Sequence, residues 1–304
     1  MRIGLTGGAA STGRLVEQAC RAEDEGFTSL WYASAVLGDP LTAMAIAGLA
    51  TSRIELGTAV VQTYPCHPVL QARRAAAAAE AMARPGFTLG IGPSHRSLVT
   101  DVYGLDYDHP GRNTEEYLRI LTAVLRTGSA DVDGVDWRAH TGEPTATPEH
   151  PVPVLLSAMS PRLLRVAGEL ADGIVSWMAP AQVLETRITP ALTAAAAAAG
   201  RPSPRIVAGL PVAVHDDVAE ARASVAANAT AYADQPNYRR ILAAGGLASP
   251  AEAAVVGDEK SVESQLRALL DAGATDIWAA VFPVGPDRVA SVRRTRELLR
   301  SLVG

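Results

Sequence analysis

The stretch GFTLGIGPSHR, residues 86–96, joins a strand-like run to a turn that carries two potential cations. Gly90 and Gly92 have no side chain to cover the backbone, and His95 and Arg96 follow them. Glycine is the residue that lets a ligand come close to the main chain. The stretch therefore predicts a binding site at the end of a buried strand, although a loop His-Arg pair is also typical of a solvated cap or an ion pair.

A second candidate site is the sequence Ser160-Pro161-Arg162. A capping serine, a proline that presets the first helical turn and an arginine lie together where backbone N–H groups point outward. Helix N-termini bind anions, because the N–H groups and the helix dipole both favour negative charge. The plainer alternative is an ordinary, well-capped helix.

The remaining strand ends carry small residues, hydroxyls and rings, at 6–8, 33–35, 62–64 and 177–178. They contain no pair of carboxylates, and no Ser-His-Asp or Cys-His set at a spacing typical of a catalytic site. This argues against hydrolysis by a protein nucleophile or by paired acids. Such a surface suits a large, flat, anionic ligand with its own chemistry better than a metal. GIGPSH lacks the third glycine of the dinucleotide fingerprint, so we reject a Rossmann interpretation.

These strand ends belong to eight short apolar runs separated by helical patterns. Asp39-Pro40 is typical of a helix start, and Gly26, Gly200 and Gly273 are typical of helix ends. The order predicts one (β/α)8 TIM-barrel domain over residues 1–304, with an open doubly wound sheet as the alternative. We expect an insertion at about 128–151, between helix 4 and strand 5, and an irregular segment at about 232–250, between strands 7 and 8. The runs are 3–5, 29–32, 54–61, 87–91, 152–156, 173–177, 206–214 and 277–282.

Composition limits the partners. The net charge of -5 argues against nucleic acid or an anionic membrane surface, so we expect a small-molecule substrate or a second copy of the chain. Two cysteines, Cys20 and Cys66, are too few for a disulfide framework, which fits a reduced, cytoplasmic setting. No window reaches the ~20 apolar residues of a membrane helix, and the N-terminus has no signal-peptide pattern.

Five motifs together resemble the luciferase-like superfamily, in its branch of oxidoreductases that use the deazaflavin coenzyme F420. They are GFTSLW at strand 2, LATSRIELGTAV from helix 2 into strand 3, HPVLQA opening helix 3, FTLGIG at strand 4 and RNTEEYLRIL in helix 4. PVPVLLSAMSPRLLRVAGELADGIVSWMAP is similar to the family's strand 5, helix 5 and strand 6. The similarity covers nearly the whole chain.

The resemblance implies cofactor contacts. It places a non-prolyl cis peptide at about Ala59-Val60, behind the ring, with Gln62 at the ring edge. It places the ribityl chain and phosphate against the loop after strand 4 and the turn after strand 5. The implied cofactor residues are Thr6, Ser34, Ala59, Val60, Gln62, Gly92, Pro93, Ser94, His95, Arg96, Ala158, Met159, Ser160, Pro161, Arg162 and Leu163.

The sequence departs from the family's dehydrogenases in one respect. Their acidic residue and histidine after strand 2 are replaced by Ser34 and Ala35, and their glutamate after strand 4 aligns with His95. This difference favours a reductase that delivers hydride to an activated C=C or C=N bond. An FMN-dependent monooxygenase and a non-catalytic F420-binding barrel are the alternatives.

His95 is the predicted proton donor or substrate anchor, and Tyr64 and Tyr103 are reserves for the proton. Trp31, Tyr64, Trp177 and the segments 128–151 and 232–250 are expected to line the substrate pocket. Family members commonly pair through helices 2 and 3, so the resemblance also implies a homodimer.

Overall fold

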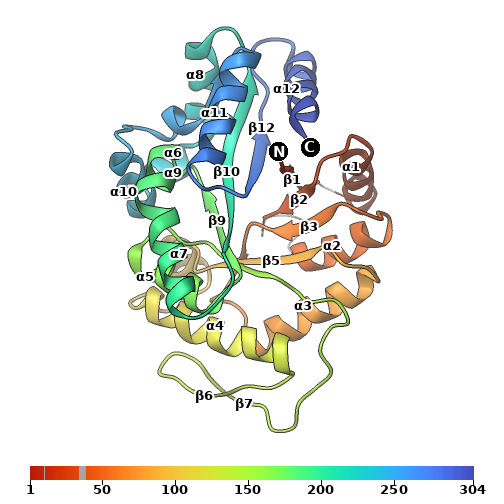
Figure 1. The fold of residues 1–304 in the computed structure, drawn as a ribbon, viewed down its shortest axis with the longest axis vertical. Coiled ribbons are helices and arrows are strands. Elements are labelled where there is room, and N and C mark those ends of the chain that lie inside the picture. The colour runs from red at the N-terminus through yellow and green to blue at the C-terminus, as the bar shows by residue number, and fades with distance from the viewer. Residues whose placement is uncertain (10, 34–38) are drawn as a thin grey trace.

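Eight parallel strands form the centre of the molecule in the computed structural model, which describes residues 1–9, 11–33 and 39–304. The strands are β1 (Ile3–Gly7), β2 (Ser29–Tyr32), β3 (Glu55–Thr58), β5 (Phe87–Gly92), β8 (Val154–Leu156), β9 (Gly173–Trp177), β10 (Arg205–Val214) and β12 (Asp276–Val281). Pairing of β9 with β10 and of β12 with β1 closes the sheet into a barrel (Figure 1). The (β/α)8 fold and the eight strands are confirmed.

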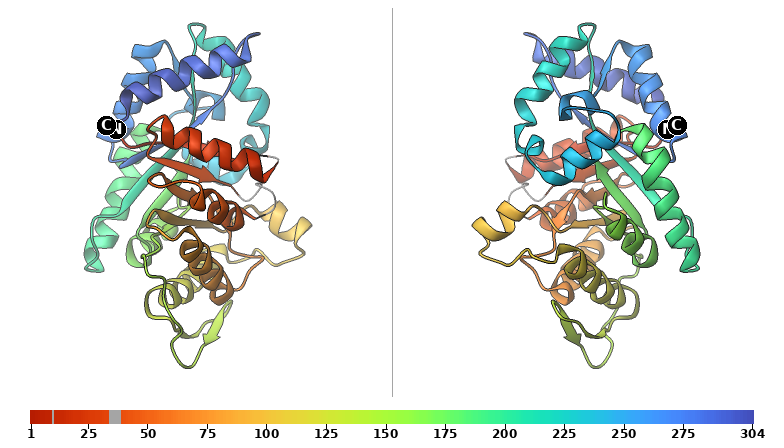
Figure 2. Two further views of the ribbon diagram at one scale, coloured as in Figure 1. Left: turned by 90° about the vertical axis from the view of Figure 1, so that its right-hand side faces the viewer. Right: turned by 90° about the vertical axis from the view of Figure 1, so that its left-hand side faces the viewer.

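Helices cover the outside of this barrel (Figures 1 and 2). Asp39 and Ser160 cap α2 and α5, as the sequence predicts, and Gly26, Gly200 and Gly273 follow helix ends with positive φ. The long helices are α1 (Thr12–Asp24), α2 (Pro40–Leu49), α3 (Pro68–Met82), α4 (Pro110–Thr127), α5 (Pro161–Leu170), α7 (Thr189–Ala198), α8 (Val218–Asn228), α11 (Glu259–Asp271) and α12 (Arg288–Leu302).

Among the described residues, no helix is both long and apolar enough to cross a lipid bilayer.

Shorter elements lie in the connections between the barrel strands and the long helices. The short elements are β4 (Val61–Gln62), β11 (Val255–Gly257), α6 (Ala181–Val183), α9 (Thr230–Ala233), α10 (Pro236–Ala244), the π-helices η1 (Leu98–Val102) and η2 (Leu184–Ile188), and the 3₁₀-helix η3 (Pro250–Ala253).

The barrel strands are buried on both faces, which explains their nearly continuous apolar runs. Their outward side chains join the main core under the helices. Their inward side chains form a second cluster that fills the barrel, with Trp31, Leu155, Val175, Val207 and Trp278 as its buried members. The barrel interior is therefore a packed core and not a pore.

A charged network closes the amino end of the barrel. Arg205, the first residue of β10, lies between Glu55 at the start of β3 (Nη1–Oε1 2.6 Å) and Asp276 at the start of β12 (Nη2–Oδ1 2.7 Å). Its guanidinium lies 5.5 Å from the centroid of the Trp31 ring. Arg2 adds a second cation to the same two carboxylates from the solvent side.

The insertion at 128–151 contains a short antiparallel hairpin, β6 (Asp131–Asp133) and β7 (Arg138–His140). Glu116 of α4 fixes its turn by accepting hydrogen bonds from the N–H groups of residues 135–137. The hairpin is therefore held against α4. The Trp137 ring also contacts Tyr117, at a centroid distance of 5.5 Å.

The segment 232–250 is mostly helical, so the prediction of an irregular segment is wrong. It holds the end of α9, all of α10 and the start of η3. Pro236 occupies the first turn of α10, and Tyr238, Ile241 and Leu242 form its buried face. This i, i+3, i+4 spacing gives α10 an apolar stripe that packs on the barrel.

The Glu23 carboxylate of α1 holds the chain that leads into β3. It accepts hydrogen bonds from the backbone N–H groups of Ser52 (3.0 Å), Arg53 (2.6 Å) and Ile54 (2.8 Å). Its partial burial acts to raise the pKa, but these bonds favour the charged form more strongly and lower the pKa of Glu23 to about 2.

We expect Glu23→Gln to lower the free energy of unfolding at pH 7 by about 1 kcal/mol, because the amide cannot accept all of these bonds. Since the folded-state pKa is lowered, the contribution is complete above the usual value of 4.5 and is lost as the pH falls toward about 2. Urea unfolding across this range measures the difference. Glu17→Gln, an exposed position on the same helix, is the control. A loss that does not depend on pH would contradict the explanation.

Candidate functional site

A cavity of about 980 Å³ opens at the carboxyl end of the barrel strands. It lies where the loops after β3, β5 and β8 meet α10 and the start of α4. Ten of the sixteen residues that the resemblance assigned to the cofactor line it. They are Val60, Gly92, Pro93, Ser94, His95, Arg96, Met159, Ser160, Arg162 and Leu163.

Three helices start at this cavity, and each has proline in its first turn. His109 precedes α4, Ser160 precedes α5 and Gln235 precedes α10, and all three residues line the cavity. The Ser160 hydroxyl accepts a hydrogen bond from the Leu163 N–H, whereas the side chains of His109 and Gln235 make no capping bond. N–H groups of the first turns of α4 and α10 are thus left for a ligand.

The cavity carries more cations than anions. Arginine guanidinium groups bind phosphate and carboxylate oxygens through paired hydrogen bonds. The charged residues that line the cavity therefore favour an anionic ligand. The lining arginines are Arg96, Arg112, Arg162 and Arg240, and the lining acids are Asp101 and Asp108.

The end of β5 needs the glycine that the sequence places there. A Cβ atom on Gly92 would lie 2.9 Å from Ser157 Cβ and 3.0 Å from Val60 Cγ2. Beyond it, Ser94 adopts a left-handed conformation with φ 64°. The Tyr107 hydroxyl donates a hydrogen bond to the Ser94 carbonyl oxygen (2.8 Å). These contacts hold the loop that carries His95 against the cavity wall.

The peptide bond between Ala59 and Val60 is cis, which confirms the prediction for this position. The predicted third strand, 54–61, is divided there into β3 and β4. Val60 lines the cavity, and both residues also pack on the aromatic cluster inside the barrel. The segment thus connects the barrel core with the cavity.

His95 is half-buried, and its ring centroid lies 6.0 Å from that of Tyr238 on α10. Among the described residues, its side chain has no hydrogen-bond or ion-pair partner. Burial lowers the pKa of His95 below its usual value of 6.5, because an apolar environment disfavours the charged ring. The protonated ring is therefore a stronger acid than an exposed histidine.

Five of the predicted cofactor residues lie outside this cavity. Ala59 and Ala158 are largely covered, Pro161 faces solvent, and the Thr6 hydroxyl accepts a hydrogen bond from Trp278 Nε1 (2.9 Å). Gln62 Oε1 accepts a hydrogen bond from the Tyr103 hydroxyl (2.5 Å). The sixth, Ser34, lies outside the described residues, as does Ala35.

Two aromatic predictions need correction. Trp31 is fully buried inside the barrel and donates its indole N–H to Ser29 Oγ, so its assignment to a substrate pocket is wrong. Tyr64 is 7% exposed and packs under Tyr107 at 5.1 Å, outside the cavity lining. Burial raises the pKa of Tyr64, which makes its hydroxyl a weaker acid. Its position gives no support to a role as reserve proton donor, and Tyr103 is likewise absent from the lining.

The insertion 128–151 contributes no residue to this cavity, which therefore gives no support to its expected place in the substrate-pocket wall. The segment 232–250 does contribute, through residues 235–238 and 240. Trp177 is half-buried at the end of β9 and belongs to a row of rings that runs from the cavity wall into the barrel interior. The row runs from His95 through Tyr238, Tyr232 and Trp177 to Trp278, with centroid distances of 6.0, 5.1, 6.2 and 4.8 Å.

Sequence reasoning missed one part of the cavity wall, which runs from Tyr107 to Arg112. It placed the segment 232–250 in the pocket wall but did not predict that residues 236–244 form the helix α10. Both segments contain an X-Pro step that starts a helix, His109-Pro110 and Gln235-Pro236. This signal matches the one used for Ser160-Pro161, and it would have found them.

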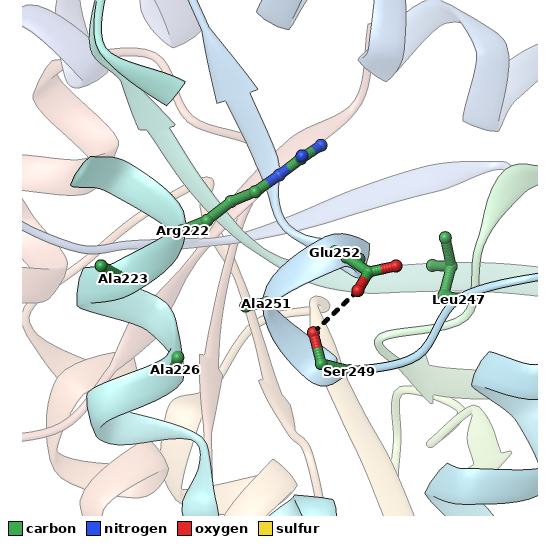
Figure 3. Close-up of a pocket in the computed structure, with 7 residues that line it drawn as sticks. All are labelled: Arg222, Ala223, Ala226, Leu247, Ser249, Ala251 and Glu252. Atoms are coloured by element: carbon green, nitrogen blue, oxygen red, sulfur yellow. Dashed lines mark hydrogen bonds between the residues drawn. The ribbon is translucent and has the colours of Figure 1, made fainter. Parts of the chain in front are cut away.

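A smaller cavity of about 490 Å³ lies between α8 and η3, away from the strand ends already described. Figure 3 shows alanine methyl groups on one side and η3 on the other. The Glu252 carboxylate is occupied by hydrogen bonds from Ser249 Oγ (3.3 Å) and the Ala248 N–H (3.1 Å). Arg222 is the one further charged group in its lining, whereas the larger cavity has many polar groups from several loops and is the candidate site.

Comparison with known proteins gives a family match over residues 2–302, to the model described as luciferase-like monooxygenase. A putative coenzyme F420-dependent oxidoreductase of Mycobacterium tuberculosis (strain ATCC 25618 / H37Rv) is 31% identical over 189 residues, covering 57% of this chain and 54% of that protein. The match thus spans about half of either protein.

Solved structures with bound cofactors share the fold. An F420-dependent secondary alcohol dehydrogenase with an F420-acetone adduct superposes with a TM-score of 0.78 at 17% identity, covering 98% of this chain and 97% of that one. The oxygenating constituent of 3,6-diketocamphane monooxygenase from Pseudomonas putida, in complex with FMN, gives 0.74 at 19% identity, covering 100% and 97%. At these identities the likeness establishes the fold.

Proposed function

Because the chain belongs to the luciferase-like monooxygenase family, we propose that it is an oxidoreductase that uses coenzyme F420 and reduces a small molecule. The observation that carries the proposal is the cavity at the carboxyl end of the barrel, where three helix N-termini and four arginines face one space. This donor set suits a cofactor with an anionic tail. The F420-dependent relative supports this choice of cofactor.

Residues of the chain would hold the cofactor in three places. Ser160, the Arg162 side chain and the Arg162 N–H would bind its phosphate, since Pro161 has no N–H and the Leu163 N–H is bonded to Ser160 Oγ. The loop from Gly92 to Arg96 would follow the ribityl chain, and Val60 would support the ring. When bound in its reduced form, F420 supplies a hydride from C5 of the deazaflavin ring.

We propose that His95 gives the proton that completes reduction of an activated C=C or C=N bond. Its position on the cavity wall allows contact with a substrate, and its lowered pKa makes the protonated ring a ready donor. A lowered pKa also makes His95 a poor base for taking a proton from an alcohol. No carboxylate pairs with the His95 ring in the described part of the chain. This chemistry favours reduction over alcohol oxidation.

Titration of the purified protein with each cofactor tests the proposal. We expect F420 to quench the fluorescence of Trp177 and to bind at least about tenfold more tightly than FMN, a difference of about 1.4 kcal/mol. Trp177→Phe should remove much of the quenching and leave the affinity unchanged, which identifies the reporting ring. Tight binding of FMN without binding of F420 would instead support the monooxygenase alternative.

The homodimer remains part of the proposal. Two large apolar side chains, Leu49 on α2 and Leu70 on α3, are exposed in the single chain. Leu49 ends α2 and Leu70 lies in the first turn of α3, so they do not form one patch, and the homodimer is proposed from the pairing through helices 2 and 3 that the family resemblance implies.

A further inference from the structure

Arg240 differs from the other three arginines of the cavity, because it has no carboxylate partner among the described residues. It is exposed on α10, and it lines the cavity. The positive charge of Arg240 is thus available to a ligand, whereas the others are largely compensated. The compensated pairs are Arg96 Nη1 with Asp108 (3.4 Å), Arg112 Nε with Asp136 (2.9 Å) and Arg162 Nη2 with Glu115 (3.2 Å).

Tyr238 provides a second, independent indication on the same helix. The residue is only 7% exposed and lines the cavity, yet its hydroxyl has no hydrogen-bond partner in the described part of the chain. The Tyr238 ring is buried, but its hydroxyl oxygen keeps some exposure and lies at the cavity wall. The hydroxyl can therefore donate a hydrogen bond to a ligand in the cavity.

The backbone at the start of α10 adds further donors. Gln235, in the N-cap position, makes no side-chain capping bond, and Asn237 and Tyr238 follow in the first turn. First-turn N–H groups have no partner within their own helix and favour negative charge. The α10 wall therefore combines backbone donors, one hydroxyl and one uncompensated guanidinium.

We propose that this wall, made of Gln235, Tyr238 and Arg240, is a second anion subsite that binds the cofactor tail beyond its first phosphate. The inference rests on the proposed use of F420. The tail of F420 continues past its phosphate into glutamate carboxylates, whereas FMN ends at one phosphate. The start of α5 would take the phosphate that both cofactors share. The α10 wall would then select the longer, polyanionic tail.

Two matched arginine variants test the subsite. Arg240→Met removes the cavity cation, and Arg239→Met removes the same charge from the next position of α10, outside the lining. The measured quantity is the dissociation constant of two probes, F420 and the deazaflavin alcohol that lacks phosphate and tail. Fluorescence quenching reports both without any turnover.

We expect Arg240→Met to weaken F420 binding about tenfold, as for the loss of a charge-assisted hydrogen bond, and Arg239→Met to change it less than about twofold. The deazaflavin alcohol should bind equally to wild type and both variants. The tenfold effect should shrink as salt is added. Tyr238→Phe, which keeps the ring contact with His95, should weaken F420 binding about threefold.

Equal F420 affinities for the two arginine variants would overturn the subsite. An equal loss of affinity for the deazaflavin alcohol in Arg240→Met would also overturn it, since that probe has no tail. Failure of the wild type to bind F420 is a different result, because it would overturn the proposed function itself.

Discussion

Arg205→Met should lower the free energy of unfolding by about 3 kcal/mol, because it leaves two carboxylates at the closed end of the barrel without their main partner. Asp276 is 1% exposed and Arg205 bridges it to the half-buried Glu55, so the variant leaves the Asp276 carboxylate buried without its main partner. A methionine of similar length keeps the contact with Trp31 but supplies no charge. Urea unfolding at neutral pH measures the loss.

Arg2→Met is the matched control for this experiment. Arg2 contacts the same two carboxylates, but its side chain is 52% exposed, so its pairs are screened by water. We expect a cost below about 1 kcal/mol for this variant. Equal losses for the two arginines would show that burial of Arg205 does not decide its contribution.

The same network has a defined pH dependence. Burial acts to raise the pKa of Asp276, but the hydrogen bonds and charge of Arg205 outweigh it and hold the pKa below its usual value of 3.8. A lowered carboxyl pKa contributes stability that is complete above the usual value and is lost as the pH falls through the lowered one. The difference in the free energy of unfolding between the wild type and Arg205→Met should therefore become smaller as the pH falls below the usual carboxyl pKa.

His95→Ala should reduce turnover by about a hundredfold or more if this side chain gives the proton, since positioned acids contribute at least that much. Oxidation of reduced F420 by a panel of activated enones and cyclic imines measures the rate. His109→Ala is the matched control, because His109 lines the same cavity and its side chain makes no capping bond. We expect the control to keep most of its activity.

The pH profile separates an acid from a simple anchor. A proton donor must be protonated, so the wild-type rate should rise as the pH falls through the lowered pKa of His95. This limb of the profile should vanish in His95→Ala. An alanine variant that keeps the limb, or loses less than about tenfold in rate, would contradict the role of His95 as the acid.

Much of the fold could be predicted because burial on both faces leaves a clear pattern. Each barrel strand is an apolar run, and the helix starts at Asp39 and Ser160 carry a capping side chain followed by proline. The cavity wall from Gly92 to Arg96 was also predictable, since glycine at a strand end has a physical reason there. These features depend on neighbours close in sequence.

The errors concern contacts between distant segments. Trp31 stands at a strand end in the sequence, but its inward direction and its contact with Arg205 depend on a strand about 170 residues later. Tyr64 is covered by Tyr107, which belongs to a loop after the next strand. The α10 helix was missed because its polar and glycine-rich surroundings outweighed the short apolar spacing of Tyr238, Ile241 and Leu242.

The filled barrel has a kinetic consequence. Trp31 occupies its middle and Arg205 its amino end, so among the described residues the interior gives no route through the molecule. Reactants that use the large cavity would therefore enter and leave at the carboxyl end of the barrel. If two reactants share the cavity, the one that binds deeper must bind first and dissociate last. Steady-state measurements should accordingly show a compulsory order of addition, with the outer reactant exchanging while the inner one stays in place.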